Sequence, residues 1–209
     1  MSDTLTVHFH PEEHADQSWP DPRQDRYAKT YLGFWIYLLT DCALFASFFI
    51  TYAVLNRHTF GGAGPADLFV LWLPFVQTLL LLISSMTSGW VMLAACRDDL
   101  KQVLFALFAT ALLGISFLSF EGYEFAHLLA EGHSWKNSAF LSSFFSLVGM
   151  HGVHIVGGLV WLAVLVGQVA TFGITASVFR RLAMFTLFWH FLDLIWVFIF
   201  TFVYLMGVL

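Results

Sequence analysis

The sequence predicts an all-α integral membrane protein, folded as a bundle of five transmembrane helices. Hydrophobic residues make up 59% of the 209-residue chain and charged residues only 11%, whereas a soluble domain normally carries about 25% charge. Five apolar segments each supply the roughly 20 helical residues needed to cross a hydrocarbon core about 30 Å thick. A membrane-spanning barrel would instead need short segments of alternating hydrophobicity, which the sequence lacks.

Glycine, proline or charged residues separate the five predicted helices. The helices run over about 31–55, 68–95, 103–129, 138–171 and 182–206. The breaks between them lie at 61–65, 97–99, 131–137 and 173–177. The fourth helix is long enough to tilt or to extend beyond the bilayer. Residues 27–209 are therefore expected to form one membrane domain.

The first 26 residues are predicted to be a disordered polar tail. They contain three prolines, scattered acidic residues and too few apolar residues for a core. No cleavable signal peptide is visible in them. His8, His10 and His14 could bind a metal weakly, but a solvated tail is the favoured interpretation.

Lys and Arg are distributed unevenly between the two ends of the predicted helices. Seven lie on the side of the N-terminal tail, and only Arg57 and Lys136 lie on the opposite side. Cytoplasmic loops carry the excess of positive charge, so the N-terminus is predicted to be cytoplasmic and the C-terminus periplasmic. Trp135 and Tyr204, at outer helix ends, suit the aromatic belt at the membrane interface.

Several classes of function find no support in the sequence. The two cysteines, Cys42 and Cys96, each lie in an apolar stretch, without the spacing of a disulfide framework, a zinc site or a binuclear copper centre. Much of the acid behind the net charge of −5 lies in the tail. Because no basic patch with interleaved aromatic residues occurs, nucleic-acid binding is not expected.

Seven ionisable side chains interrupt the predicted helices and are the candidate functional residues. They are Asp41, Glu121, Glu124, His151, His154, His190 and Asp193. A charge at the bilayer centre costs about 2.5–3.5 kcal/mol, so such residues usually face protein or water. Six of them form pairs three residues apart, and each pair projects from one helix face.

Two interpretations of these residues remain open. They form a polar seam that assists proton movement or binds lipid headgroups, or they are polar contacts that hold helices together, each worth about 0.6 kcal/mol. The second interpretation is the simpler. In either case Glu121 and Glu124, in the outer third of the third helix, are expected to approach the upper part of the fourth helix.

No catalytic, cofactor-binding or metal-ligating set is predicted. Glu124 and His127 have the Glu-x-x-His spacing of di-iron bundles, but the second such pair that those sites need is missing. His151 and His154 lie on one helix and cannot ligate opposite faces of one haem. A haem would need partners from two helices, such as His154 with His190.

Short motifs occur in order on all five predicted helices. They are GFWIY and DCALF at 33–37 and 41–45, LP and SSMT at 73–74 and 84–87, EGYEF at 121–125, GMHGVH at 149–154 and FWHFLDLIW at 188–196. With these motifs the sequence resembles subunit III of the haem–copper respiratory oxidases. It is most similar to the short five-helix form, subunit 3, of bacterial cytochrome bo-type ubiquinol oxidases.

The sequence departs from the family pattern at a few positions. The first two helices of the seven-helix cytochrome c oxidase form are absent. Asp41 stands where that form usually has glutamate, and Trp72 where a polar or acidic residue is frequent. Gln77 replaces a frequent Asn or Glu. A proton role at Trp72 is therefore not expected.

The resemblance implies a non-catalytic subunit of a proton-pumping ubiquinol oxidase that reduces oxygen to water in the bacterial inner membrane. It implies that haems and copper belong to subunit I and that this chain carries no cofactor. Its partners would be subunit I, subunits II and IV, and membrane lipids. It would support assembly, stability, and oxygen or proton access. The alternatives are subunit III of a cytochrome c oxidase and a stand-alone membrane haem or metal protein.

Overall fold

The described part of the chain in a computed structural model comprises residues 22–56, 58, 59 and 71–208, and it consists of helices joined by short loops, without strands. The elements are α1 (Pro22–Leu55), α3 (Trp72–Cys96), α4 (Leu100–Ala130), α5 (Ala139–Phe172), α6 (Ala176–Ile199), the π-helix η1 (Phe200–Leu205) and α7 (Met206–Val208). Among the described residues, five helices are long and apolar enough to cross a membrane. The predicted all-α class with five spanning helices is confirmed.

Capping residues set several helix ends that hydropathy alone does not locate. The Asp99 carboxylate accepts from the backbone N–H of Gln102 at 3.1 Å, so α4 begins three residues before its predicted start. Thr175 caps α6 in the same way, and that helix begins six residues early. Both cases follow from the need to satisfy the free N–H groups of a first helical turn.

Helix α1 begins at Pro22, earlier than expected. Proline suits a first helical turn because its φ is already helical and its missing N–H would have no partner there. The helix thus includes 22–26, the end of the segment predicted as disordered, while its apolar span, Lys29–Leu55, agrees with the expected first span. Tail residues 1–21 and the predicted start of the second helix at 68 lie outside the described residues.

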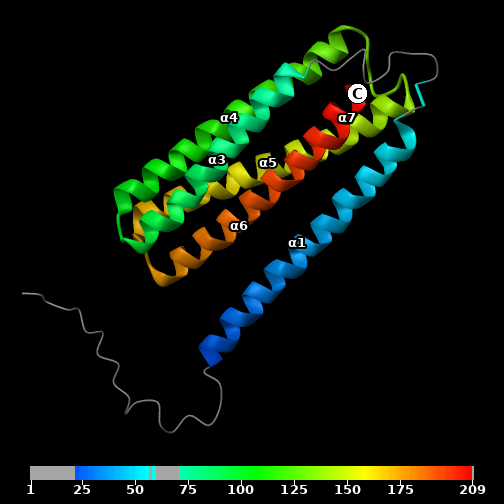
Figure 1. Cartoon of the computed structure of the whole chain (residues 1–209). Helices are drawn as coiled ribbons and strands as arrows, with labels where there is room; N and C mark the ends of the chain where they lie inside the picture. Colours follow the sequence, from blue (N-terminus) through cyan, green and yellow to red (C-terminus); the bar gives the residue numbers. More distant parts are fainter. Residues whose placement is uncertain (1–21, 57, 60–70, 209) are drawn as a thin grey trace, which may run out of the picture. The chain divides into compact units, whose positions relative to one another are not determined.

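The chain divides into two compact units, Met1–Leu39 and Thr40–Leu209. In the second unit α4 packs against α3 and α5, and α6 packs against α3 and α5. These four helices lie side by side in Figure 1. The second half of α1 belongs to the same unit and contributes Asp41, Phe45 and Tyr52, all buried.

Trp189 of α6 lies at the centre of this unit and is fully buried. Its Nε1–H donates to Ser84 Oγ of α3 at 2.8 Å. Two glycines make room for the indole: a Cβ on Gly158 of α5 would lie 2.9 Å from it, and a Cβ on Gly114 of α4 would lie 3.0 Å away. One side chain therefore contacts three neighbouring helices, and the glycines set how closely those helices approach.

Candidate functional site

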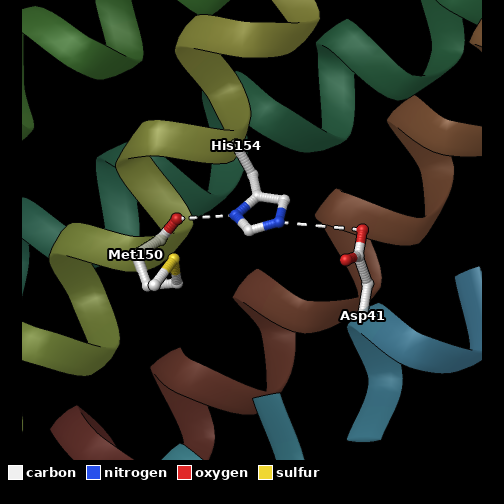
Figure 2. A network of polar contacts seen from close by, with 3 residues as sticks. All are labelled: Asp41, Met150 and His154. Carbon is white, nitrogen blue, oxygen red and sulfur yellow. Dashed lines mark hydrogen bonds and ion pairs between the residues drawn. The ribbon is translucent and has the colours of Figure 1, made fainter. Parts of the chain in front are cut away.

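Asp41 of α1 and His154 of α5 form a contact between two spanning helices (Figure 2). The His154 ring is oriented by its own helix, because Nδ1–H donates to the Met150 carbonyl at 2.8 Å. The other ring nitrogen, Nε2, lies 3.7 Å from Asp41 Oδ2. Both side chains are largely shielded, with 15% and 11% of their areas exposed for His154 and Asp41.

The bond to the Met150 carbonyl constrains the ring nitrogens of His154. A carbonyl oxygen can only accept, so Nδ1 must carry a proton, and Nε2 is then either an acceptor or the second N–H of an imidazolium. Phe45 covers the ring, with centroids 5.1 Å apart.

Glu121 of α4 is hydrogen-bonded to α3. It is 4% exposed, and its Oε2 accepts from Gln77 Nε2–H at 3.0 Å. Gln77 is itself fully buried. The outer-third acids of this helix were expected near the upper part of α5, but Glu121 instead joins α4 to α3.

Glu124, one turn further along α4, is hydrogen-bonded to the π-helix. Its Oε2 accepts from the hydroxyl of Tyr204 at 3.1 Å, and Tyr204 is fully buried. The preceding residue, Val203, offers its carbonyl to the hydroxyl of Tyr52 on α1 at 3.4 Å. The segment η1 therefore connects α4 with α1. The expectation that Tyr204 lies in an interfacial belt was wrong, because its hydroxyl finds a partner inside the protein.

His151 lies in an aromatic environment and is fully buried. Its ring is 5.3 Å from the Trp196 ring and 5.8 Å from the Phe117 ring, measured between centroids. Neither ring nitrogen has a hydrogen-bond partner among the described residues. His151 therefore fills space between α4, α5 and α6 as an aromatic core residue does.

His190 and Asp193 occupy different environments although they are three residues apart on α6. Asp193 is 6% exposed and lies beside Ser85 of α3. His190 is exposed, and its Nδ1–H donates to the Thr186 carbonyl at 2.6 Å. Among the seven candidate residues, Asp41 and His154 contact each other, whereas Glu121 and Glu124 bond residues outside the set.

Sequence reasoning did not select Gln77, Tyr204 or Tyr52 as site residues. Gln77 was noted only as a departure from a family pattern, Tyr204 was assigned to the interfacial belt, and Tyr52 was not singled out. A buried glutamate requires a hydrogen-bond donor from a neighbouring helix. The amide side chain in the adjacent span could therefore have identified Gln77 as a partner of Glu121. The hydrogen-bond partners of the two tyrosines depend on the π-helical turn, which no residue pattern predicts.

The two residues of the Glu-x-x-His motif have different partners in the structure. Glu124 bonds Tyr204, whereas His127 Nδ1 lies 3.5 Å from Glu131 Oε2 on the exposed end of α4. Within the described ranges, no three His, Cys, Asp or Glu side chains come together in a way that could hold a metal ion.

A mostly apolar cavity of about 960 Å³ lies between the second half of α1 and the end of α6 with η1. Its lining includes Phe45, Phe49, Phe198 and Phe202, with Asn56 as a polar group. Such a cavity within a membrane bundle suits a flexible hydrocarbon chain better than a polar ligand.

Comparisons with known proteins give one consistent family. Residues 27–208 match the family described as cytochrome c oxidase subunit III. The chain is 51% identical over 189 residues to the cytochrome bo(3) ubiquinol oxidase subunit 3 of Pseudomonas aeruginosa, covering 90% of each chain. It is 49% identical to the Pseudomonas putida protein of the same name, over 86% of this chain and 87% of that one. It is 44% identical to the cytochrome c oxidase subunit 3 of Alkalihalophilus pseudofirmus, over 85% of this chain and 87% of that one.

Proposed function

Because the chain belongs to the cytochrome c oxidase subunit III family, we propose that it is the non-catalytic third subunit of a bacterial cytochrome bo-type ubiquinol oxidase. This enzyme is the terminal oxidase of an aerobic respiratory chain, and it couples oxygen reduction to proton pumping. The match over 27–208, which covers all five spans, is the observation that carries the proposal.

Relatives from the quinol-oxidase branch favour ubiquinol as the donor of the whole complex. The two Pseudomonas relatives share 51% and 49% identity, against 44% for the cytochrome c oxidase relative. The alternative, subunit III of a cytochrome c oxidase, predicts that the purified complex oxidises reduced cytochrome c. The quinol proposal predicts oxidation of ubiquinol and not of the cytochrome.

The haems and copper of the complex belong, in this proposal, to subunit I. His154 Nε2 lies 3.7 Å from Asp41 Oδ2 and aromatic rings surround His151, which supports that assignment for these two histidines. What remains for these residues is to hold helices, lipids and a neighbouring subunit in position.

Lipid binding is the role that the cavity supports. Its aromatic lining would hold an acyl chain in contact with α1 and α6, and so would stabilise both helices in the assembled enzyme. Subunit I is the main protein partner in this proposal, with subunits II and IV nearby, in the bacterial inner membrane. Assembly and durability during turnover are the properties that the chain contributes.

Co-purification tests the proposal. A tag on this chain, used to isolate complexes from membranes of aerobically grown cells, is expected to recover the larger oxidase subunits with ubiquinol oxidase activity. Recovery of the chain alone, from membranes that do contain the oxidase, would contradict the proposal.

A further inference from the structure

Gln77 of α3 and Glu121 of α4 share one hydrogen bond, but each side chain has a second polar atom without a partner. Gln77 Nε2–H donates to Glu121 Oε2 at 3.0 Å. The other oxygens, Gln77 Oε1 and Glu121 Oε1, have no hydrogen-bond partner among the described residues. Gln77 is fully buried and Glu121 is 4% exposed. A buried polar atom without a partner costs free energy, so these two oxygens need a donor.

A different orientation of the Gln77 amide does not supply this donor. If the amide turned over, its oxygen would face Glu121 Oε2, and two acceptors would meet while the existing bond was lost. The hydroxyl of Tyr204 already donates to Glu124, one turn further along α4, at 3.1 Å. The hydroxyl of Thr78, next to Gln77, donates to a carbonyl of its own helix at 2.7 Å. The donor must therefore be a group that does not belong to these side chains.

The two free oxygens lie near each other, because each belongs to a group that takes part in the existing bond. Gln77 Oε1 is on the same carbon as Nε2, and Glu121 Oε1 is on the same carbon as Oε2. A water molecule has two hydrogens, so one molecule can donate to both oxygens. Buried waters typically make about three hydrogen bonds to protein groups that would otherwise be unsatisfied.

We propose that one internal water molecule binds between Gln77 Oε1 and Glu121 Oε1 and completes the polar contact between α3 and α4. Both residues lie within spanning helices, Trp72–Cys96 and Leu100–Ala130, so the water is enclosed in the membrane part of the chain. The two helices are then joined at this level by one direct hydrogen bond and one bridged by water. The site belongs to this chain alone and does not depend on the assembly that contains it.

A cryo-electron microscopy map of the assembled complex, at a resolution that shows ordered water, tests the site directly. The expected result is one peak about 2.8 Å from both Gln77 Oε1 and Glu121 Oε1. Direct contact between these two oxygens would show that a proton on Glu121 is the donor, and would overturn the proposal. The absence of a peak would overturn it too, as would a peak with the short distances and many oxygen ligands of a metal ion.

Substitutions test which atoms hold the water. Glu121→Gln replaces one carboxyl oxygen by an amide NH₂, which can donate directly to Gln77 Oε1 while the remaining oxygen still accepts from Nε2–H. No donor is then missing, and the water peak is expected to disappear. Thr110→Val is the matched control, because it removes a hydroxyl that bonds Thr87 across the same two helices at 2.8 Å. Its water peak is expected to remain.

A peak that persists in Glu121→Gln, or that is lost in both variants, would show that these two oxygens do not hold the water, and would overturn the proposal. The map of the unmodified chain decides the matter even where a variant does not assemble. If the chain is recovered without oxidase subunits, the proposed function fails. A crystal structure of the recovered chain then tests the water site by the same peak.

Discussion

Asp41 and His154 depend on each other, because loss of either leaves a polar group without its partner inside a spanning helix. Their contact joins α1 to α5, and the ring is already fixed by its bond to the Met150 carbonyl. Both side chains of the pair are largely shielded from solvent. Its effect on the enzyme is therefore expected through the stability of the subunit, and not through a step of oxygen reduction.

Asp41→Asn keeps the size of the side chain and an N–H donor for Nε2, but it removes the acid. We expect the initial rate of oxygen reduction to stay close to normal, while retention of the subunit or sustained turnover weakens by a few-fold, as for one membrane contact. Asp41→Glu is the matched control and should behave as the unmodified chain does. Immediate loss of all activity from an intact complex would contradict this account.

Tyr204→Phe removes the hydroxyl that donates to Glu124. The expected cost is about 0.6 kcal/mol and at most about 1.7 kcal/mol, the range measured for such bonds in membranes. This cost is measured as a decrease in the temperature at which the subunit dissociates from the complex. Glu124→Gln should cost less in the Tyr204→Phe background than alone, because the two residues share one bond. Strictly additive effects would show that the bond contributes nothing.

Sequence reasoning located the residues with unusual polarity but not all of their surroundings. It selected Asp41 and His154, which the fold brings together, and Glu121 and Glu124, whose partners it did not name. It also treated His190 and Asp193 as one face, because they are three residues apart. Three residues leave an offset of about 60° around a helix, enough for Asp193 to face α3 while His190 faces outward.

At the scale of helices, close packing around Trp189 restricts which substitutions the neighbouring helices can accept. Gly158→Ala puts a methyl group 2.9 Å from the indole, so the helices must move apart or the ring must shift. Overpacking of this kind costs about 1–3 kcal/mol. Gly157→Ala, where nothing lies within 4 Å of the added atom, is the matched control.

The two glycine variants are compared by thermal unfolding of the purified complex, followed through release of this subunit. Gly158→Ala is expected to lower the transition temperature, and Gly157→Ala to leave it unchanged. The same transition temperature for both variants would mean that α5 and α6 adjust freely around Trp189.

Helix number and approximate position follow from apolar length, because a span needs about 20 residues in any membrane helix. Helix ends are less predictable, since caps such as Thr175 extend a helix into polar sequence that hydropathy assigns to a loop. The π-helix η1 was not predictable, because its residues are as apolar as the turn before them. Tyr204 points into the protein from this wider π-helical turn.

At the scale of the whole subunit, the cavity between α1 and α6 is the feature that lipid would fill. Ala53→Trp places a large ring at the lining, while Ala43→Trp adds the same ring at an exposed position outside it. We expect fewer phospholipids per complex for Ala53→Trp only, measured as phosphorus per haem after purification. Equal phospholipid content in the two variants would argue against an acyl chain in this cavity.

We propose that this chain positions helices, lipids and neighbouring subunits and carries no electron carrier of its own. The most direct measurement separates the subunit from the purified oxidase and determines iron, copper and the visible haem spectrum in both fractions. All haem and copper are expected to remain with the larger subunits, and the separated chain is expected to contain neither. Stoichiometric iron, copper or a haem band in the separated chain would contradict it.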